Sequence, residues 1–225
     1  EAPGLGMVNF HYATGPNYVG HCHADKGSLV LEMGDEAVLI ERGSAVYSNP
    51  ETGIMKQSDR HSMVVPFDEE GEWYCQPLVE GYGGVLKRAE LEGGRLHVFS
   101  DDTGAWEAGL YKKSTREVVS ESPDVYTITD TGVLARPVGG VAVLFQTLSP
   151  VEQDGDGFVI RAKQGSVRIT PVGWSPAESS CETISVDGEL RPVSVIRFAT
   201  GPVNEYTLET RVEVLPRAGG KGAIE

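Results

Sequence analysis

Short runs in which apolar and polar residues alternate recur along almost the whole chain, separated by Gly, Pro, Asp and Asn. A period of two is typical of strands that turn one face to a core and the other to solvent. No segment longer than two turns shows the helical period. Candidate strands follow one another at intervals of about 8 to 14 residues, as in a pair of packed antiparallel sheets. We therefore predict an all-β fold, a large two-sheet antiparallel β-sandwich.

The candidate strands are alternating or apolar runs bounded by turn residues. They lie at 7–12, 29–31, 37–40, 62–65, 84–91, 96–100, 116–120, 125–129, 141–148, 158–162, 166–171, 193–198 and 206–214. Gly-Asp-rich segments at 33–36, 101–104 and 154–157 are predicted as turns between strands. With 40% hydrophobic residues in 225, the chain can bury a substantial core. We expect one domain over residues 1–215 and a flexible, Gly-rich tail at 216–225.

The net charge, the apolar runs, the cysteines and the first residues of the chain each narrow the class of protein. A net charge of -14 argues against nucleic acid or an anionic membrane surface, because both require a basic face. No run approaches the roughly 20 apolar residues that span a bilayer. Cys22, Cys75 and Cys181 cannot all pair within one chain, so we expect free thiols with at most one disulfide. The chain begins without Met or a signal peptide, so we expect a processed protein or a part of a longer one.

Three of the five histidines lie in two short blocks, Gly20–Lys26 and Asp59–Val65. The first block contains His21 and His23, and the second contains His61. A His-x-His pair on a β-strand would place both imidazoles on one face, within reach of a common ion. The same spacing also fits two histidines that lie at the surface or in ordinary hydrogen bonds.

One acid, Glu41, follows the apolar run 37–40 directly. A carboxylate at the end of a buried strand is costly unless it is paired or bound to a metal. Imidazole and carboxylate together are a ligand set that zinc accepts. The residues therefore indicate a metal site, and the alternative is an ordinary ion pair of Glu41 with Arg42 or Arg60 at the surface.

These segments resemble the heparinase II/III-like polysaccharide lyases. The block Gly20–Ser28, a hydrophobic strand, a Gly-containing hairpin and then Leu39-Ile40-Glu41-x-Gly43 are similar to the family pattern. Its oligoalginate lyase branch shows the same His-x-His-x-Asp-Lys order. Tyr47 corresponds to a family Tyr after the strand, and Arg60–Val64 corresponds to the family's Arg-rich run into a His-Asn-Thr-Val strand.

A looser resemblance continues at Arg116 and over Pro123–Asp130, similar to the family's Arg-x-Val and Tyr-x-hydrophobic-x-Asp strand pair. The match is specific over residues 7–68 and weaker over 105–136. It implies a β-sandwich domain that normally follows an α/α toroid in the same polypeptide.

The resemblance also implies the residues of a site. One structural zinc ion per chain would be held by His23, Glu41 and His61. His21 would face the substrate cleft and take part in catalysis, and Tyr47 is a second candidate for proton transfer.

The sequence departs from the family pattern at two positions. Glu41 is one methylene longer than the family's usual Asp, and Ser62 stands where the family has Asn. Asp25 and Glu32 are further oxygen donors that would serve if Glu41 does not bind.

In such lyases the reaction is β-elimination across a uronic-acid glycosidic bond. The uronate carboxylate is neutralised, one group removes the C5 proton, and another protonates the departing 4-oxygen. The family's carboxylate-neutralising groups come from the toroid, so we expect this chain to form one wall of an active site and to be inactive alone. The implied partners are an anionic polysaccharide or oligosaccharide and the N-terminal toroid of the parent chain, in a periplasmic or extracellular location, with a homodimer also open. Lys26, Arg42, Lys56 and Arg60 would offset the acidic net charge near the site.

Two other classes of protein remain open at the level of sequence. A cupin-like metalloprotein also has a His-x-His motif in a β-barrel. The cupin motif requires a Glu about four residues after the pair, where this chain has Lys26–Ser28. A non-catalytic carbohydrate-binding sandwich would use Trp73, Trp106 or Trp174 to stack on sugar rings. We interpret His11 and His97 as strand histidines in structural hydrogen bonds.

Overall fold

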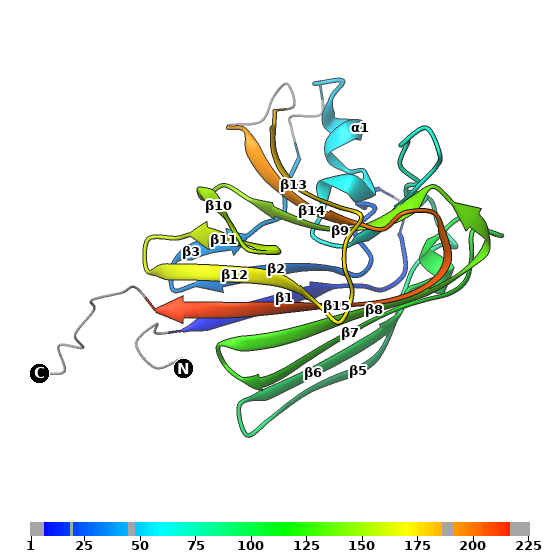
Figure 1. The fold of residues 1–225 in the computed structure, drawn as a ribbon. Coiled ribbons are helices and arrows are strands. Elements are labelled where there is room, and N and C mark those ends of the chain that lie inside the picture. The colour runs from blue at the N-terminus through cyan, green and yellow to red at the C-terminus, as the bar shows by residue number, and fades with distance from the viewer. Residues whose placement is uncertain (1–6, 19, 45–47, 186–190, 217–225) are drawn as a thin grey trace, which may run out of the picture.

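Three antiparallel sheets make up the computed structural model of the chain, which describes residues 7–18, 20–44, 48–185 and 191–216 (Figure 1). The largest has eight strands in the order β10-β11-β12-β15-β8-β7-β6-β5, the second has four in the order β13-β14-β9-β4, and the third is β1-β2-β3. The strands are β1 (Val8–Ala13), β2 (Ser28–Met33), β3 (Glu36–Leu39), β4 (Val64–Phe67), β5 (Val85–Glu92), β6 (Arg95–Asp101), β7 (Tyr111–Ser122), β8 (Val125–Val138), β9 (Gly140–Thr147), β10 (Val151–Asp154), β11 (Gly157–Arg161), β12 (Gly165–Val172), β13 (Glu178–Ile184), β14 (Val193–Ala199) and β15 (Val203–Pro216). Short helical turns occur at α1 (Thr52–Met55), η1 (Ser58–Arg60) and η2 (Thr103–Ala105).

The eight-stranded and four-stranded sheets stack face to face around one apolar core (Figure 1). Phe158 of β11 and Phe198 of β14 meet across the two layers with ring centroids 5.6 Å apart. The small sheet adds Leu29, Leu31 and Met33 of β2 to the same core. The predicted all-β antiparallel sandwich is therefore confirmed, and the three-stranded sheet is an addition to it.

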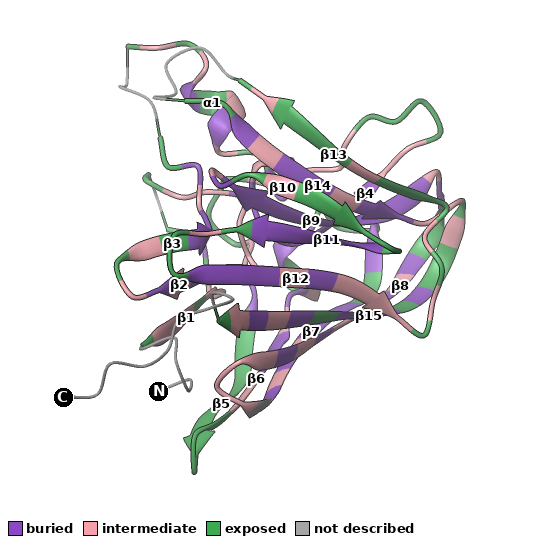
Figure 2. Cartoon of the chain, turned by 60° about the vertical axis from the view of Figure 1, so that its left-hand side comes forward, coloured by how far each residue is buried: buried purple, intermediate pink, exposed green. Residues whose placement is uncertain are grey.

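Burial along each strand explains why the alternation was visible in the sequence. From Val125 to Leu134, strand β8 alternates between half-buried and buried residues without interruption. Strand β9 is buried at all eight positions because it is covered on both faces, which is why it is apolar rather than alternating. The exposed strands β5 and β13 lie at the edges of their sheets (Figure 2).

All the predicted strands are present, most with boundaries that differ by a few residues, and β8 continues well beyond the predicted 125–129 to Val138. The turns expected at 33–36 and 154–157 connect β2 to β3 and β10 to β11. The turn expected at 101–104 instead leads into the 3-10 helix η2. Strands β10 and β13 were not predicted, because their residues are largely polar and exposed. Among the described residues, no helix has the length and apolar character needed to cross a membrane.

A charged pair lies in the interior of the larger sheet, where the alternation of β8 turns Asp130 inward. Asp130 is directly opposite Arg116 of β7 in the strand register. The Arg116 guanidinium donates from Nε and Nη2 to the two carboxylate oxygens at 2.7 and 2.8 Å, and both side chains are buried. Such a two-point contact is the strongest form of an arginine–carboxylate pair.

The third nitrogen of the same guanidinium reaches out of the sheet. Arg116 Nη1 donates to the backbone carbonyls of Gly27 at 2.6 Å and Ser62 at 3.1 Å. Gly27 directly follows the first histidine block and Ser62 directly follows His61, so one side chain holds both blocks against the sheet.

We expect Asp130→Ala to lower the free energy of unfolding by about 3–5 kcal/mol, because it leaves the Arg116 guanidinium buried without its counter-charge. Denaturant unfolding measures this change. The matched control is Glu152→Ala, which breaks the exposed pair with Arg161 and should cost less than about 1 kcal/mol. Similar small losses in both variants would contradict the role given to the buried pair.

Candidate metal centre

The His-x-His block lies in a loop that leads into β2, and not on a strand. Gly20 has a φ of 80° and His21 a φ of 57°, so two consecutive residues are in the left-handed region. The expectation that both imidazoles share one strand face is therefore wrong, because a left-handed backbone interrupts the extended conformation. His21 is exposed, and a left-handed backbone is uncommon for a non-glycine residue and recurs at functional sites.

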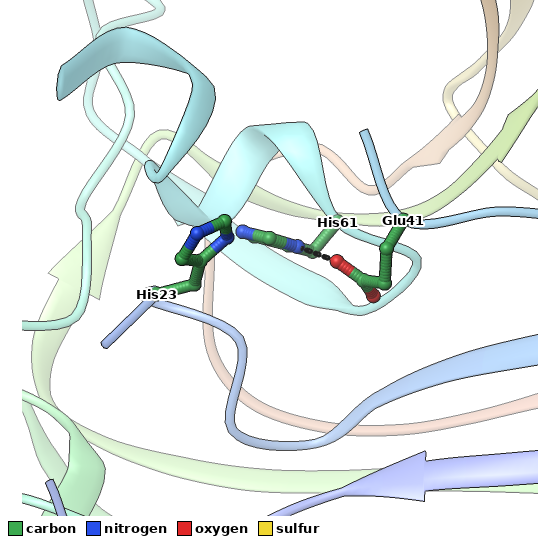
Figure 3. Close-up of side chains that lie close together, drawn as sticks. All are labelled: His23, Glu41 and His61. Atoms are coloured by element: carbon green, nitrogen blue, oxygen red, sulfur yellow. Dashed lines mark hydrogen bonds and ion pairs between the residues drawn. The ribbon is translucent and has the colours of Figure 1, made fainter. Parts of the chain in front are cut away.

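Three of the predicted site residues converge in space. His23 comes from the loop before β2, Glu41 lies two residues after β3 ends, and His61 follows η1. One potential ligand atom from each lies within 4.8 Å of the others. Figure 3 shows the His61 ring between the other two side chains. The structure thus brings together the ligand set implied by the family resemblance.

His61 is fully buried and its two ring nitrogens have different surroundings. Nδ1 is hydrogen-bonded to Oε2 of Glu41. Nε2 is buried, lies on the side of the ring that faces His23, and has no hydrogen-bond partner in the described part of the chain (Figure 3). An unpaired, buried imidazole nitrogen is costly, and a metal ion would satisfy it.

Glu41 is held from both sides. Its Oε1 accepts a hydrogen bond of 2.9 Å from the hydroxyl of Ser28, the first residue of β2, while Oε2 meets His61. Ser28 is part of the motif Gly20–Ser28, but no role for it was predicted from the motif. A carboxylate in this position can bind a metal directly, or it can fix the tautomer and orientation of a histidine that binds the metal.

His23 completes the cluster and is half-buried, with its ring centroid 5.4 Å from that of His61. Burial lowers the pKa of His23, and the neighbouring His61 lowers it further. The ring is therefore neutral at pH 7, which is the form that binds a metal. Two imidazoles, one of them with an unpaired buried nitrogen, and one carboxylate give three donors, which fit a zinc site with room for a fourth ligand.

The remaining candidate ligands lie outside this cluster. Asp25 pairs with Lys26 Nζ at 2.5 Å, and Glu32 accepts a hydrogen bond from Asn9 on the β1–β2 pair. Cys22 donates through its thiol to the carbonyl of Tyr18 at 2.9 Å. All three cysteines of the chain are free. Tyr47 falls outside the residues that the structure describes.

The other histidines and the tryptophans have structural surroundings. His11 contacts Glu32 at 3.3 Å and His97 contacts Glu117 at 2.6 Å, which confirms their interpretation as hydrogen-bonded strand residues.

Of the three tryptophans, Trp106 is closed to a sugar ring, whereas Trp73 and Trp174 are half-buried. Trp106 is 3% exposed, and Trp174 donates its indole N–H to the carbonyl of Glu209. Trp73 packs edge-on against Phe67 and lies beneath the Arg197 guanidinium.

The fold and this cluster define the class of protein. The family model for "Heparinase II/III-like, C-terminal" matches residues 8–188, and the chain belongs to this family. The resemblance found in the motifs is thereby confirmed, and the cupin alternative is not supported.

Solved structures show the same fold. A heparinase III with methylated lysines has a TM-score of 0.74 and 14% identity, over 95% of this chain and 33% of that chain. The heparan sulfate lyase HepC from Pedobacter heparinus has a TM-score of 0.73 and 13% identity, over 96% of this chain and 34% of that one. The chain thus spans about a third of the length of these proteins. No curated protein matches it in sequence.

In the metal-free protein, we expect His61 to carry its proton on Nδ1, because Glu41 accepts a hydrogen bond there and Nε2 has no acceptor. Long-range proton–nitrogen NMR correlations of the imidazole rings report which nitrogen is protonated. His97 is the internal control, because its Nε2 meets Glu117 and should carry the proton. A neutral His61 protonated on Nε2 would contradict this arrangement.

Proposed function

We propose that this chain is the β-sandwich domain of a polysaccharide lyase, which cleaves uronic-acid glycosidic bonds by β-elimination and binds one structural zinc ion through His23, Glu41 and His61. The observation that carries the proposal is the convergence of these three side chains, with one potential ligand atom from each within 4.8 Å of the others. The buried, unpaired Nε2 of His61 on the side of His23 adds to it. Membership of the heparinase II/III-like family supplies the reaction class.

The proposed zinc has a structural role. Its three donors come from three separate segments. His23 lies in the loop before β2, Glu41 lies two residues after the end of β3, and His61 directly follows η1. A bound zinc ion would supply bond energy that ties these segments together. The chain's own contribution is to present His23 neutral, to orient His61 through Glu41, and to hold Glu41 through Ser28.

His21 is the proposed catalytic group of this domain. It is exposed and lies two residues from His23, so a fixed His23 limits where the His21 backbone can go. An imidazole in that position would transfer a proton at C5 or at the departing 4-oxygen of the sugar. Tyr47 remains a second candidate, and the heparinase and heparan sulfate lyase names of the similar structures favour a uronic-acid substrate.

Three of the four basic residues near the site are engaged within this chain, which favours another domain as the binder of the substrate carboxylate. Lys26 Nζ pairs with Asp25 and the carbonyl of His23, Arg60 pairs with Asp59, and Arg42 is buried against Gln146. These cations are used to hold the fold, so they do not replace a carboxylate-neutralising group. A helical toroid upstream in the parent protein, secreted or periplasmic, would supply it.

We expect the purified and dialysed chain to retain about one zinc ion per molecule, because three protein side chains would hold it. Elemental analysis measures the content. His61→Ala should lose the metal because it removes the central, fully buried donor. His97→Ala is the matched control, since it removes a histidine–glutamate contact outside the cluster and should keep the zinc. Well-folded wild-type protein without any metal would overturn the zinc proposal.

We expect His21→Ala to lower the lyase rate of the full-length parent protein by roughly 100- to 10,000-fold, the usual contribution of a general acid or base. The ultraviolet absorbance of the unsaturated uronate product measures the rate on uronic-acid polymers. His11→Ala, which changes an exposed histidine on β1, is the control and should retain full activity. Hydrolysis without an unsaturated product would exclude β-elimination, and an active His21→Ala variant would exclude His21.

A further inference from the structure

Two buried glutamines form hydrogen bonds with backbone groups of residues that lie within three positions of the proposed zinc ligands. We infer that Gln76 and Gln146 are positioning residues, which set the distances between His23, Glu41 and His61 without touching a metal. The inference rests on the zinc site proposed above and assigns the part of the chain that gives this site its geometry.

Gln146 of β9 connects the Glu41 segment to the His61 segment. Its side-chain amide donates to the carbonyl of Asp59 at 3.2 Å and accepts from Arg42 Nη1 at 3.4 Å. Its backbone carbonyl accepts from Ile40 N–H at 3.0 Å, and its backbone N–H donates to the hydroxyl of Ser62 at 3.0 Å. Ile40 and Arg42 flank one proposed ligand, and Asp59 and Ser62 lie within two residues of another.

Gln76 connects the His23 segment to the His61 segment. Its side-chain Oε1 accepts from Lys26 N–H and its Nε2 donates to the Lys26 carbonyl, both at 2.9 Å. Its backbone N–H donates to the hydroxyl of Ser58 at 3.0 Å. Lys26 is three residues after one ligand and Ser58 is three residues before the other. Gln76 is 2% exposed, and no described metal-ligand candidate is among its hydrogen-bond partners.

The two contacts require an amide. In each case the side chain donates one hydrogen bond and accepts another, and the partners lie outside the sheets: Lys26 and Arg42 in loops, Asp59 in the short helix η1. A carboxylate would lose the donor, and a thioether would lose the strong donor and acceptor at similar volume. Since these segments carry the ligands, losing the amide lets the ligand atoms move apart. The sheets are unaffected, because their strands keep their backbone hydrogen bonds to one another.

The test uses Gln76→Glu and Gln146→Glu, which replace the amide donor with a carboxylate oxygen and add a negative charge, and the uncharged Gln76→Met and Gln146→Met, which remove both side-chain hydrogen bonds. Zinc affinity is measured by competition with a chromophoric chelator. The visible absorption of the cobalt-loaded protein reports the ligand geometry. We expect affinity to fall by about 10- to 100-fold, the usual effect of losing a partner that orients a ligand, together with a changed cobalt spectrum.

Tyr206→Phe is the matched control, because it removes the buried hydrogen bond of 2.8 Å between Tyr206 and Tyr111, elsewhere in the core. It should lower stability in denaturant unfolding and leave both the zinc affinity and the cobalt spectrum unchanged. This readout separates positioning from a general loss of stability.

The outcomes distinguish this inference from the function on which it rests. A wild-type chain that binds neither zinc nor cobalt overturns both. A wild-type chain that binds metal, with folded Gln→Glu variants of unchanged affinity and spectrum, overturns the positioning role alone. Should the Met variants fail to fold, the nearly isosteric Glu variants decide the question.

Discussion

The buried pair of Arg116 and Asp130 is the interaction on which the relation between sheet and site depends. Neither charge would be tolerated in this interior without the other. Two nitrogens of the guanidinium satisfy Asp130, and the remaining one is left to bind the carbonyls of Gly27 and Ser62. The charge inside the sheet therefore anchors two loops that lie more than thirty residues apart in sequence, and both loops carry histidines of the proposed zinc site.

The positions of the three proposed ligands therefore depend more on hydrogen bonds to the backbone around them than on side-chain packing. Arg116, Gln76 and Gln146 contact backbone atoms around the ligands, and Ser28 contacts the carboxylate of Glu41. The eight-stranded sheet contributes Arg116 and the four-stranded sheet contributes Gln146. Both layers of the sandwich thus act on the same few loop residues, which is how a fold made of regular strands can hold an irregular site.

The sequence predicted the structure correctly where residues follow a periodic pattern or match a family motif. Alternation identified β8, the apolar run identified β9, and the family resemblance identified His23, Glu41 and His61. It failed for β10 and β13, whose exposed edge positions select for no hydrophobic pattern. It also failed for the loop at His21, where a left-handed backbone overrides the strand-like spacing. Gln76 and Gln146 could not be found, because their partners are mainly backbone groups, which every residue has.

Strand β15 has a further consequence for how this domain is made. It pairs with β12 on one side and β8 on the other, and so joins β10–β12 to β5–β8 within the larger sheet. The last described strand in sequence is thus central in space, and the larger sheet remains two separate halves until it is in place. Contacts of such long sequence separation form slowly. During synthesis, the edges of β8 and β12 that β15 will cover therefore stay unpaired until β15 has left the ribosome.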